Sequence, residues 1–88
     1  MQRNEGMNNA QKIAEIVRKV ANKPVAPDLE DQLFEMGYLD SFGLTDLVME
    51  IEKEFGIRFP DSDLNPRRFE TVERIEALLE SRWARTAG

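Results

Sequence analysis

The stretch that decides the fold runs from residue 39 to residue 56 and reads Leu39-Asp40-Ser41-Phe42-Gly43-Leu44-Thr45-Asp46-Leu47-Val48-Met49-Glu50-Ile51-Glu52-Lys53-Glu54-Phe55-Gly56. Its apolar residues recur at helical spacing, which predicts one helix from Ser41 to Phe55. The predicted buried face consists of Leu44, Leu47, Val48, Ile51 and Phe55. Asp40 is a favoured N-cap residue, and Gly56 is a natural C-terminal cap. The sequence therefore predicts an amphipathic helix that begins with an exposed serine.

The opposite face of this helix carries two large apolar side chains among charges. On a helical wheel, Phe42, Asp46, Met49 and Lys53 fall within about 60° of one another. Thr45, Glu50 and Glu52 flank them. Apolar residues ringed by charge on a solvent-facing side are typical of a docking surface. For Phe42 there is a second interpretation, in which its ring folds back under the preceding segment.

Two further helices are predicted on either side of this stretch. The first runs from Asn9 to Ala21, with Asn8 and Gln11 spaced as a capping box and Pro24 as its stop. Its apolar stripe consists of Ile13, Ile16, Val17 and Val20. The last helix runs from Val72 to Trp83 with Thr71 as its N-cap, and a short helical turn is expected at 61–64 or 67–69.

The connection from residue 22 to residue 40 is long for a compact domain and is rich in apolar residues, so we expect it to pack on the core. Those residues are Leu29, Leu33, Phe34, Met36, Tyr38 and Leu39. The prediction is an all-α fold, a small four-helix bundle with three main helices, one short helix and a long packed first loop. Residues 1–7 are expected to form a flexible leader, 8–84 the folded domain and 85–88 a flexible tail.

The composition of the 88-residue chain narrows the possible functions. There is no cysteine and no histidine, which removes thiolate chemistry and the usual general base, so we expect no enzyme and no metal site. A net charge of −5 disfavours nucleic acid. No apolar run reaches the roughly 20 residues that span a bilayer. A cytoplasmic monomer is expected.

The order Asp40-Ser41, acidic helix, Phe55-Gly56-Ile57, Phe59-Pro60-Asp61 and Thr71-Val72 resembles the acyl carrier protein family across about residues 29–79. The resemblance implies that Ser41, preceded by Asp40, receives a 4'-phosphopantetheine arm from coenzyme A. The thiol of that arm holds an acyl or aminoacyl group as a thioester. The implied partners are a phosphopantetheinyl transferase, a loading ligase and downstream transferases, which would dock on Phe42, Thr45, Asp46, Met49, Glu50, Glu52 and Lys53.

Departures from the fatty-acid carriers point to a specialised carrier. Those proteins usually follow the serine with leucine and an acid, where this chain has Phe42 and Gly43. This pattern, with Gly37-Tyr38-Leu39 and Asn65-Pro66-Arg67-Arg68-Phe69, looks more like D-alanyl and related aminoacyl carriers. An amino acid cargo needs little burial, whereas a long acyl chain would need a cavity lined by residues such as Leu47, Ile51, Ile57 and Ile75.

One alternative function remains beside the family resemblance. The chain could be a non-catalytic interaction domain that docks through the Ser41–Phe55 helix with Ser41 unmodified.

Two local features also have more than one interpretation. Gly43 allows close approach of a partner or of the arm, or is simply tolerated near the helix start. The segment 61–65 begins like a calcium loop but has Pro66 in place of the turn glycine, so Asp61 or Asp63 is interpreted as the cap of a short helical turn.

Overall fold

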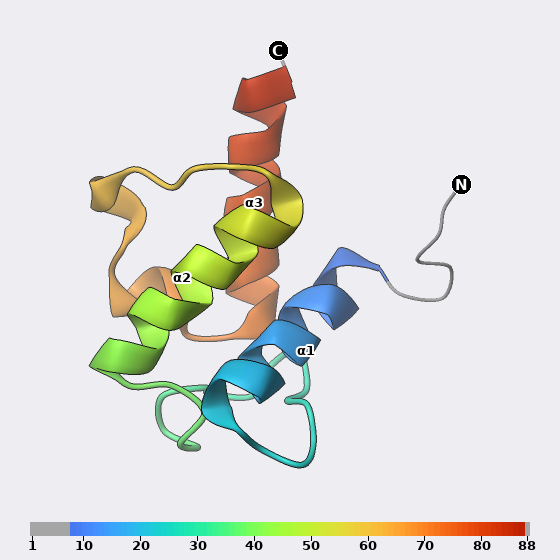
Figure 1. Cartoon of the computed structure of the whole chain (residues 1–88), viewed down its shortest axis with the longest axis vertical. Coiled ribbons are helices and arrows are strands. Elements are labelled where there is room, and N and C mark those ends of the chain that lie inside the picture. Colours follow the sequence, from blue (N-terminus) through green and yellow to red (C-terminus); the bar gives the residue numbers. More distant parts are fainter. Residues whose placement is uncertain (1–7, 88) are drawn as a thin grey trace.

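Figure 1 shows the computed structural model, in which three α-helices pack around one core. α1 spans Asn9–Ala21, α2 spans Ser41–Phe55 and α3 spans Val72–Ala87. Two short 3₁₀ helices, η1 (Asp61–Asp63) and η2 (Pro66–Phe69), lie between α2 and α3. The structure describes the backbone of residues 8–87 and the side chains of residues 8–82. The predicted leader at 1–7 and the side chain of Trp83 lie outside the described residues.

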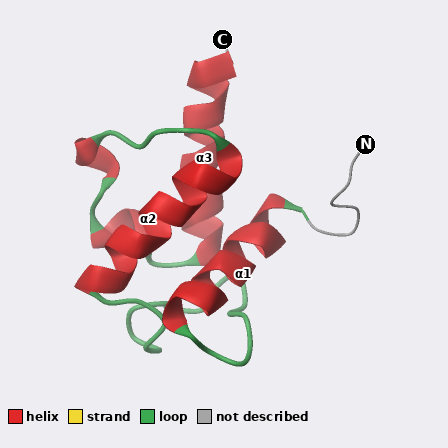
Figure 2. Cartoon of the chain, viewed as in Figure 1, coloured by secondary structure: helices red, strands yellow, loops and turns green. Residues whose placement is uncertain are grey.

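The predicted all-α class is confirmed, and Figure 2 shows only helices and loops over the described residues. The bounds predicted for α1 and α2 match, and the Asn8–Gln11 capping box forms at both of its hydrogen bonds. Both places offered for the short turn became helical, as η1 and η2. The predicted end of the last helix at Trp83 was wrong, because the helix continues to Ala87. Residues 84–87 include good helix formers and no glycine or proline, so nothing local ends it sooner.

α1 and α2 run antiparallel. The Lys12 ammonium lies 5.8 Å from the centre of the Phe55 ring, which places the start of α1 beside the end of α2. At the other end, a Cβ built on Gly43 would lie 4.0 Å from Cγ1 of Val20. α1 also packs against α3, so it contacts both other main helices.

The core is closed and apolar. Its fully buried side chains come from all three helices, the connection between α1 and α2, and η2. The largest are Phe69, Ile13, Leu33, Leu47, Ile51, Ile75, Leu79, Val17 and Val72. On α2, Leu47, Val48 and Ile51 are buried as predicted, while Leu44 and Phe55 pack against the core from its margin.

The connection between α1 and α2 packs through one side only. Leu33 and Leu39 are buried, but Leu29 and Met36, which we also expected to pack, are 45% and 53% exposed. The connection is held by its backbone as well, because Leu33 N–H donates to the Glu70 carbonyl at 2.8 Å and Glu73 N–H donates to the Leu29 carbonyl at 3.2 Å. These bonds tie the connection to the segment at the start of α3, and the side chains of Leu29 and Met36 remain outside the core.

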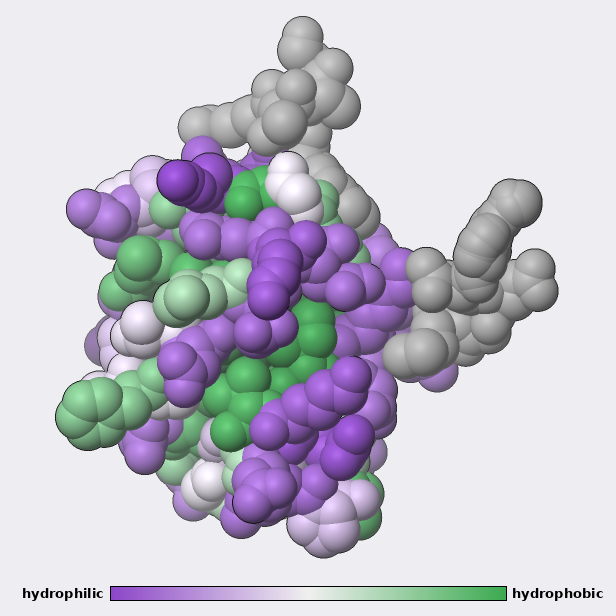
Figure 3. Space-filling view, viewed as in Figure 1, coloured by the Kyte–Doolittle hydropathy of each residue, from purple (hydrophilic) through white to green (hydrophobic). Residues whose placement is uncertain are grey.

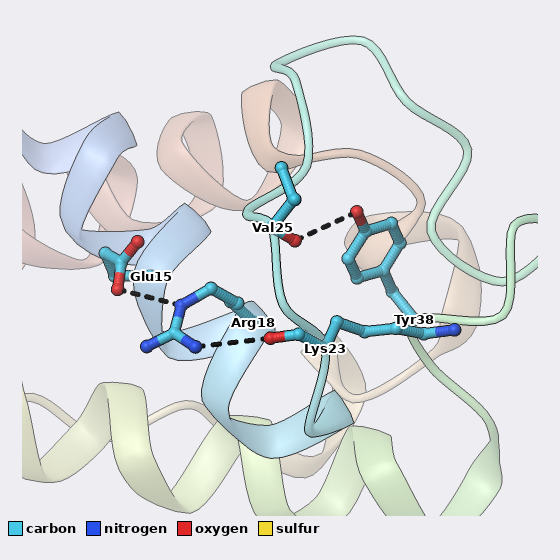
Figure 4. A network of polar contacts seen from close by, with 5 residues as sticks. All are labelled: Glu15, Arg18, Lys23, Val25 and Tyr38. Atoms are coloured by element: carbon cyan, nitrogen blue, oxygen red, sulfur yellow. Dashed lines mark hydrogen bonds and ion pairs between the residues drawn. The ribbon is translucent and has the colours of Figure 1, made fainter.

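A polar network fixes the beginning of the same connection (Figure 4). Arg18 bridges Glu15, at 3.1 Å, and the Lys23 carbonyl, at 3.2 Å. The Tyr38 hydroxyl donates to the Val25 carbonyl at 3.1 Å, and the Lys23 ammonium lies 5.7 Å from the centre of its ring. The network joins both ends of the connection, so the residues just before α2 are held in place.

Candidate functional site

Ser41 is the first residue of α2, and its surroundings are set by Asp40. The Asp40 carboxylate accepts a hydrogen bond from Gly43 N–H at 2.7 Å. The backbone carbonyl of Asp40 accepts one from Leu44 N–H at 2.8 Å. Leu39 is buried immediately before this cap. Ser41 is itself exposed. The chain therefore presents the Ser41 hydroxyl to solvent from a backbone that is fixed on both sides.

Gly43 lies close to its neighbours in this local packing. A Cβ at Gly43 would lie 3.3 Å from the Asp40 carboxylate oxygen and 3.7 Å from Cδ2 of Leu39, besides its contact with Val20. The atoms that lie close to Gly43 thus belong to this chain itself, to the cap of α2, to the residue before it and to α1.

The backbone at Ser41 offers a favourable place for a negatively charged group. The first N–H groups of a helix lack intrahelical acceptors, and the macrodipole makes this end positive. Asp40 already accepts from Gly43, and the chain holds no histidine or cysteine that would activate the serine. Among the described residues no cluster of acidic side chains could hold a metal ion. A phosphodiester on the Ser41 oxygen fits here, because its negative charge would lie at the positive end of a 15-residue helix.

The predicted docking residues are mostly exposed along α2. Phe42 is 84% exposed and Met49 is 60% exposed, so the interpretation in which Phe42 folds back under the preceding segment was wrong. Thr45, Asp46, Glu50 and Lys53 are exposed as well.

Glu52 differs from the rest of that set. It is half-buried, and its carboxylate accepts a hydrogen bond from Phe59 N–H at 2.9 Å. It therefore holds the chain after α2 rather than standing free on the outward face. The spacing on the helical wheel placed Glu52 at the edge of that face but carried no information on the loop that covers it.

Two open grooves flank Met49. One, of about 360 Å³, lies between α1 and α2, and its lining includes Ile16, Val20 and Met49. The other, of about 340 Å³, lies between α2 and the segment 58–64. Met49 therefore stands on a ridge between two hollows, one bounded by α1 and the other by the loop after α2.

The interpretation of Asp61 or Asp63 as a helix cap was wrong. η1 has Pro60 at its N-cap position and no side-chain cap. Asp63 is instead buried, with its carboxylate 3.2 Å from the Arg82 guanidinium. Sequence reasoning missed this pair because the residues are 19 apart and no local pattern joins them. The pair fastens the loop that carries Phe59 and Leu64 to α3.

Together these features define a small helical domain that offers one exposed serine at the start of a helix, beside an apolar and charged surface. Comparison with known proteins agrees with that class. Residues 11–79 match the family model described as a phosphopantetheine attachment site, so the chain belongs to this family.

Similar proteins include two D-alanyl carrier proteins. The one from Leuconostoc mesenteroides subsp. mesenteroides is 29% identical over 75 residues, covering 85% of this chain and 96% of the relative. The one from Streptococcus sanguinis is 32% identical over 71 residues, covering 80% and 90%.

The family confirms the function inferred from the sequence. The protein is a carrier of acyl or aminoacyl groups, and 4'-phosphopantetheine is its covalent prosthetic group. The interaction-domain alternative is not favoured. Over the described residues, no helix has both the length and the apolar character required to cross a membrane.

Proposed function

We propose that Ser41 is the attachment residue and that the cargo is an amino acid, with D-alanine the first candidate. The observation that carries the first part is the position of Ser41, exposed as the opening residue of α2 behind the Asp40 cap. Ser62 also lies within the matched region and is exposed, but it belongs to a three-residue 3₁₀ helix. Only a long helix places a substantial positive end beside the phosphodiester.

The prosthetic group supplies the thiol that holds the cargo as a thioester. The chain contributes the position of that group and the surface that its partners recognise. We propose that it has no catalytic activity of its own, since no histidine or cysteine is present and Asp40 is committed to the helix cap. Attachment itself requires a separate transferase that brings coenzyme A to Ser41.

Two observations support an amino acid as cargo. The named relatives are D-alanyl carrier proteins. In addition, the side chains that would have to line a chain-sheltering cavity are 5% exposed or less and pack together in the core, namely Leu47, Ile51, Ile57 and Ile75. A small polar cargo needs no such cavity.

We propose that a loading ligase and a downstream transferase dock on the outward face of α2, through Phe42, Thr45, Asp46, Met49, Glu50 and Lys53. Exposed apolar side chains supply the contact area, and the acidic ones steer basic partners. Glu52 contributes less, because Phe59 N–H already occupies its carboxylate. Association should therefore slow as salt is raised, and the variant Asp46→Lys should weaken that salt dependence. An association rate that does not change with salt would contradict this role.

We place loading in the cytoplasm, where coenzyme A and ATP are available, and expect a monomeric carrier.

The test is an intact-mass measurement after incubation with coenzyme A and a broad-specificity phosphopantetheinyl transferase. The expected result is a single added phosphopantetheine that is lost in Ser41→Ala and kept in Ser62→Ala. Ser41→Ala should keep its helical circular dichroism and its stability, because an exposed hydroxyl contributes little packing. Modification of Ser41→Ala, or none in the native chain beside a modified known carrier, would refute the assignment. Purified D-alanine ligase with ATP, compared with other amino acids and short acyl groups, then tests the cargo.

A further inference from the structure

The groove between α1 and α2 combines an apolar lining with an acidic edge. Ile16 and Val20, four residues apart on α1, and Met49 of α2 supply the apolar part of the lining. Figure 3 shows a hydrophobic strip between the hydrophilic side chains of the two helices. The hollow measures about 360 Å³, whereas one turn of a helix with its side chains fills roughly 500 Å³. The groove can therefore take one edge of a partner helix but not the whole helix.

The acidic edge of this groove consists of Asp46, Glu50 and Glu54, which are spaced four residues apart along α2. Successive carboxylates lie about 6 Å apart along the helix axis, so the row is roughly 12 Å long. All three are exposed, and no ion pair among the described residues engages them. Like charges at this spacing oppose the helix slightly. Basic side chains from another molecule would relieve that repulsion.

The lining has a clear excess of negative charge. Lys19, on the α1 side, is its single basic residue, so three carboxylates and one ammonium give the lining a net charge of −2. Complementary charge on a partner speeds its encounter with such a surface and sets its orientation. An occupant of this groove should therefore be both apolar, toward α1, and basic, toward α2.

The groove lies on the side of α2 away from Ser41. At about 100° per residue, the three residues of the acidic edge stand roughly 140–220° around the helix from Ser41. Thr45, Val48 and Glu52, which line the other groove, stand within about 40° of it. A partner seated between α1 and α2 therefore leaves Ser41 and the groove beside it open.

The groove between α2 and the segment 58–64 is less suited to a basic partner. Arg58 belongs to its lining, and the carboxylate of Glu52 already accepts a hydrogen bond from Phe59 N–H. Asp61 is the remaining carboxylate in that lining. The two grooves therefore differ in charge as well as in their position relative to Ser41.

We propose that the groove between α1 and α2 is a docking site for an amphipathic helix of a partner protein, with an apolar row along one edge and a row of arginine or lysine beside it. The apolar row contacts Ile16 and Val20, and the basic row pairs with the acidic edge. A spacing of four residues in both rows of the partner matches the spacing on α1 and α2. The docking surface then includes α1, and a partner can stay bound while an enzyme reaches Ser41. Docking itself does not depend on the proposed attachment at Ser41.

The test titrates the unmodified, ¹⁵N-labelled carrier with a synthetic helical peptide of about 14 residues, which is long enough to span the acidic edge. The peptide has leucine at two positions four residues apart and arginine at three positions four residues apart on the neighbouring edge. A scrambled peptide of the same composition is the control. Amide signals of Lys19, Val20 and Glu50 should shift and reach saturation with the designed peptide, while those of Ser41 and Thr45 stay in place.

Charge variants make the measurement specific. Glu50→Gln should weaken binding roughly 1.4- to fivefold, the range for one exposed ion pair, and Lys19→Glu should tighten it by a similar factor. Asp61→Asn is the matched control, because it removes one exposed carboxylate from the other groove and should leave the affinity unchanged. The comparison is made at physiological ionic strength, where exposed charges more than about 8 Å apart are largely screened.

Four results would each overturn the proposal. Shifts centred on Thr45, Arg58 and Leu64 would place the peptide in the other groove. Equal binding of the scrambled peptide, or equal losses in Glu50→Gln and Asp61→Asn, would show general charge attraction. Absence of any saturable shift would show that the groove has no affinity for such a helix. Shifts at the groove that depend on the concentration of the carrier alone would assign it to a second copy of this chain. The carrier function, which intact mass tests separately, stands in every case.

Discussion

Replacing Asp63 with alanine should destabilise the protein far more than removing any surface carboxylate. The Asp63 and Arg82 side chains are 6% and 20% exposed, and the Asp63 Oδ2 and Arg82 Nε atoms lie 3.2 Å apart. These two atoms are not aligned for a hydrogen bond, so the contact between them is mainly charge attraction. Without the carboxylate, the Arg82 guanidinium loses this countercharge in a position largely shielded from water.

The size of the loss follows from this burial. Removing one partner of a buried ion pair costs about 3–5 kcal/mol. Arg82 keeps a fifth of its exposure and can regain some hydration, so we expect about 2–3 kcal/mol for Asp63→Ala. In a domain of this size each kcal/mol lowers Tm by about 4–8 °C, so Tm should fall by roughly 10–20 °C.

Urea denaturation followed by circular dichroism measures the effect, with Glu70→Ala as the control. Glu70 lies 3.6 Å from Arg74, but the two side chains are 40% and 62% exposed, so its loss should cost no more than about 0.5 kcal/mol. Combining Asp63→Leu with Arg82→Met should cost less than Asp63→Ala alone, because both charges of the pair are removed together and apolar side chains take their place. Equal losses for Asp63→Ala and Glu70→Ala would refute the reasoning.

Three further changes test the site and its frame. Asp40→Ala should cost about 1 kcal/mol of stability through loss of the helix cap, while Asp40→Asn should retain most of it in the same urea titration. Gly56→Ala should cost about 1 kcal/mol, because Gly56 has φ +67° and a side chain is strained there, whatever the open space around it. Phe42→Ala should leave stability within about 0.5 kcal/mol, since the ring is 84% exposed, but should raise the KM of the loading ligase for the carrier. An unchanged KM would remove Phe42 from the docking face.

The helices and the position of Ser41 at the start of α2 were predictable because their signals are local. The periodic apolar residues of α2, the cap at Asp40 and Gly56 act within a few residues, and the observed helix begins and ends where they indicate. The one wrong helix end, at Trp83, came where the sequence offers neither glycine nor proline before Gly88.

Features that depend on tertiary contacts were not predictable in the same way. Leu29 and Met36 look like core residues by composition, yet both side chains are exposed where the connection lies against the core. Glu52 and Asp63 look like solvent-facing acids, yet one binds Phe59 N–H and the other pairs with Arg82. In each case the contact is made with a different segment of the chain. The spacing of residues within one helix does not predict that this segment lies nearby.

The closed core leads to a last prediction about cargo length. Each methylene moved from water into an apolar interior is worth about 0.8 kcal/mol, so a carrier that shelters an octanoyl chain gains stability on loading. Here Leu47, Ile51 and Ile75 are fully buried and closely packed, and a chain could enter only by separating them. We expect octanoyl and acetyl forms of the carrier to melt within about 4 °C of each other, which corresponds to less than about 1 kcal/mol. A rise of about 10 °C for the octanoyl form would show that the helices part around a chain. The preference for a short amino acid cargo would then have to arise in the loading ligase alone.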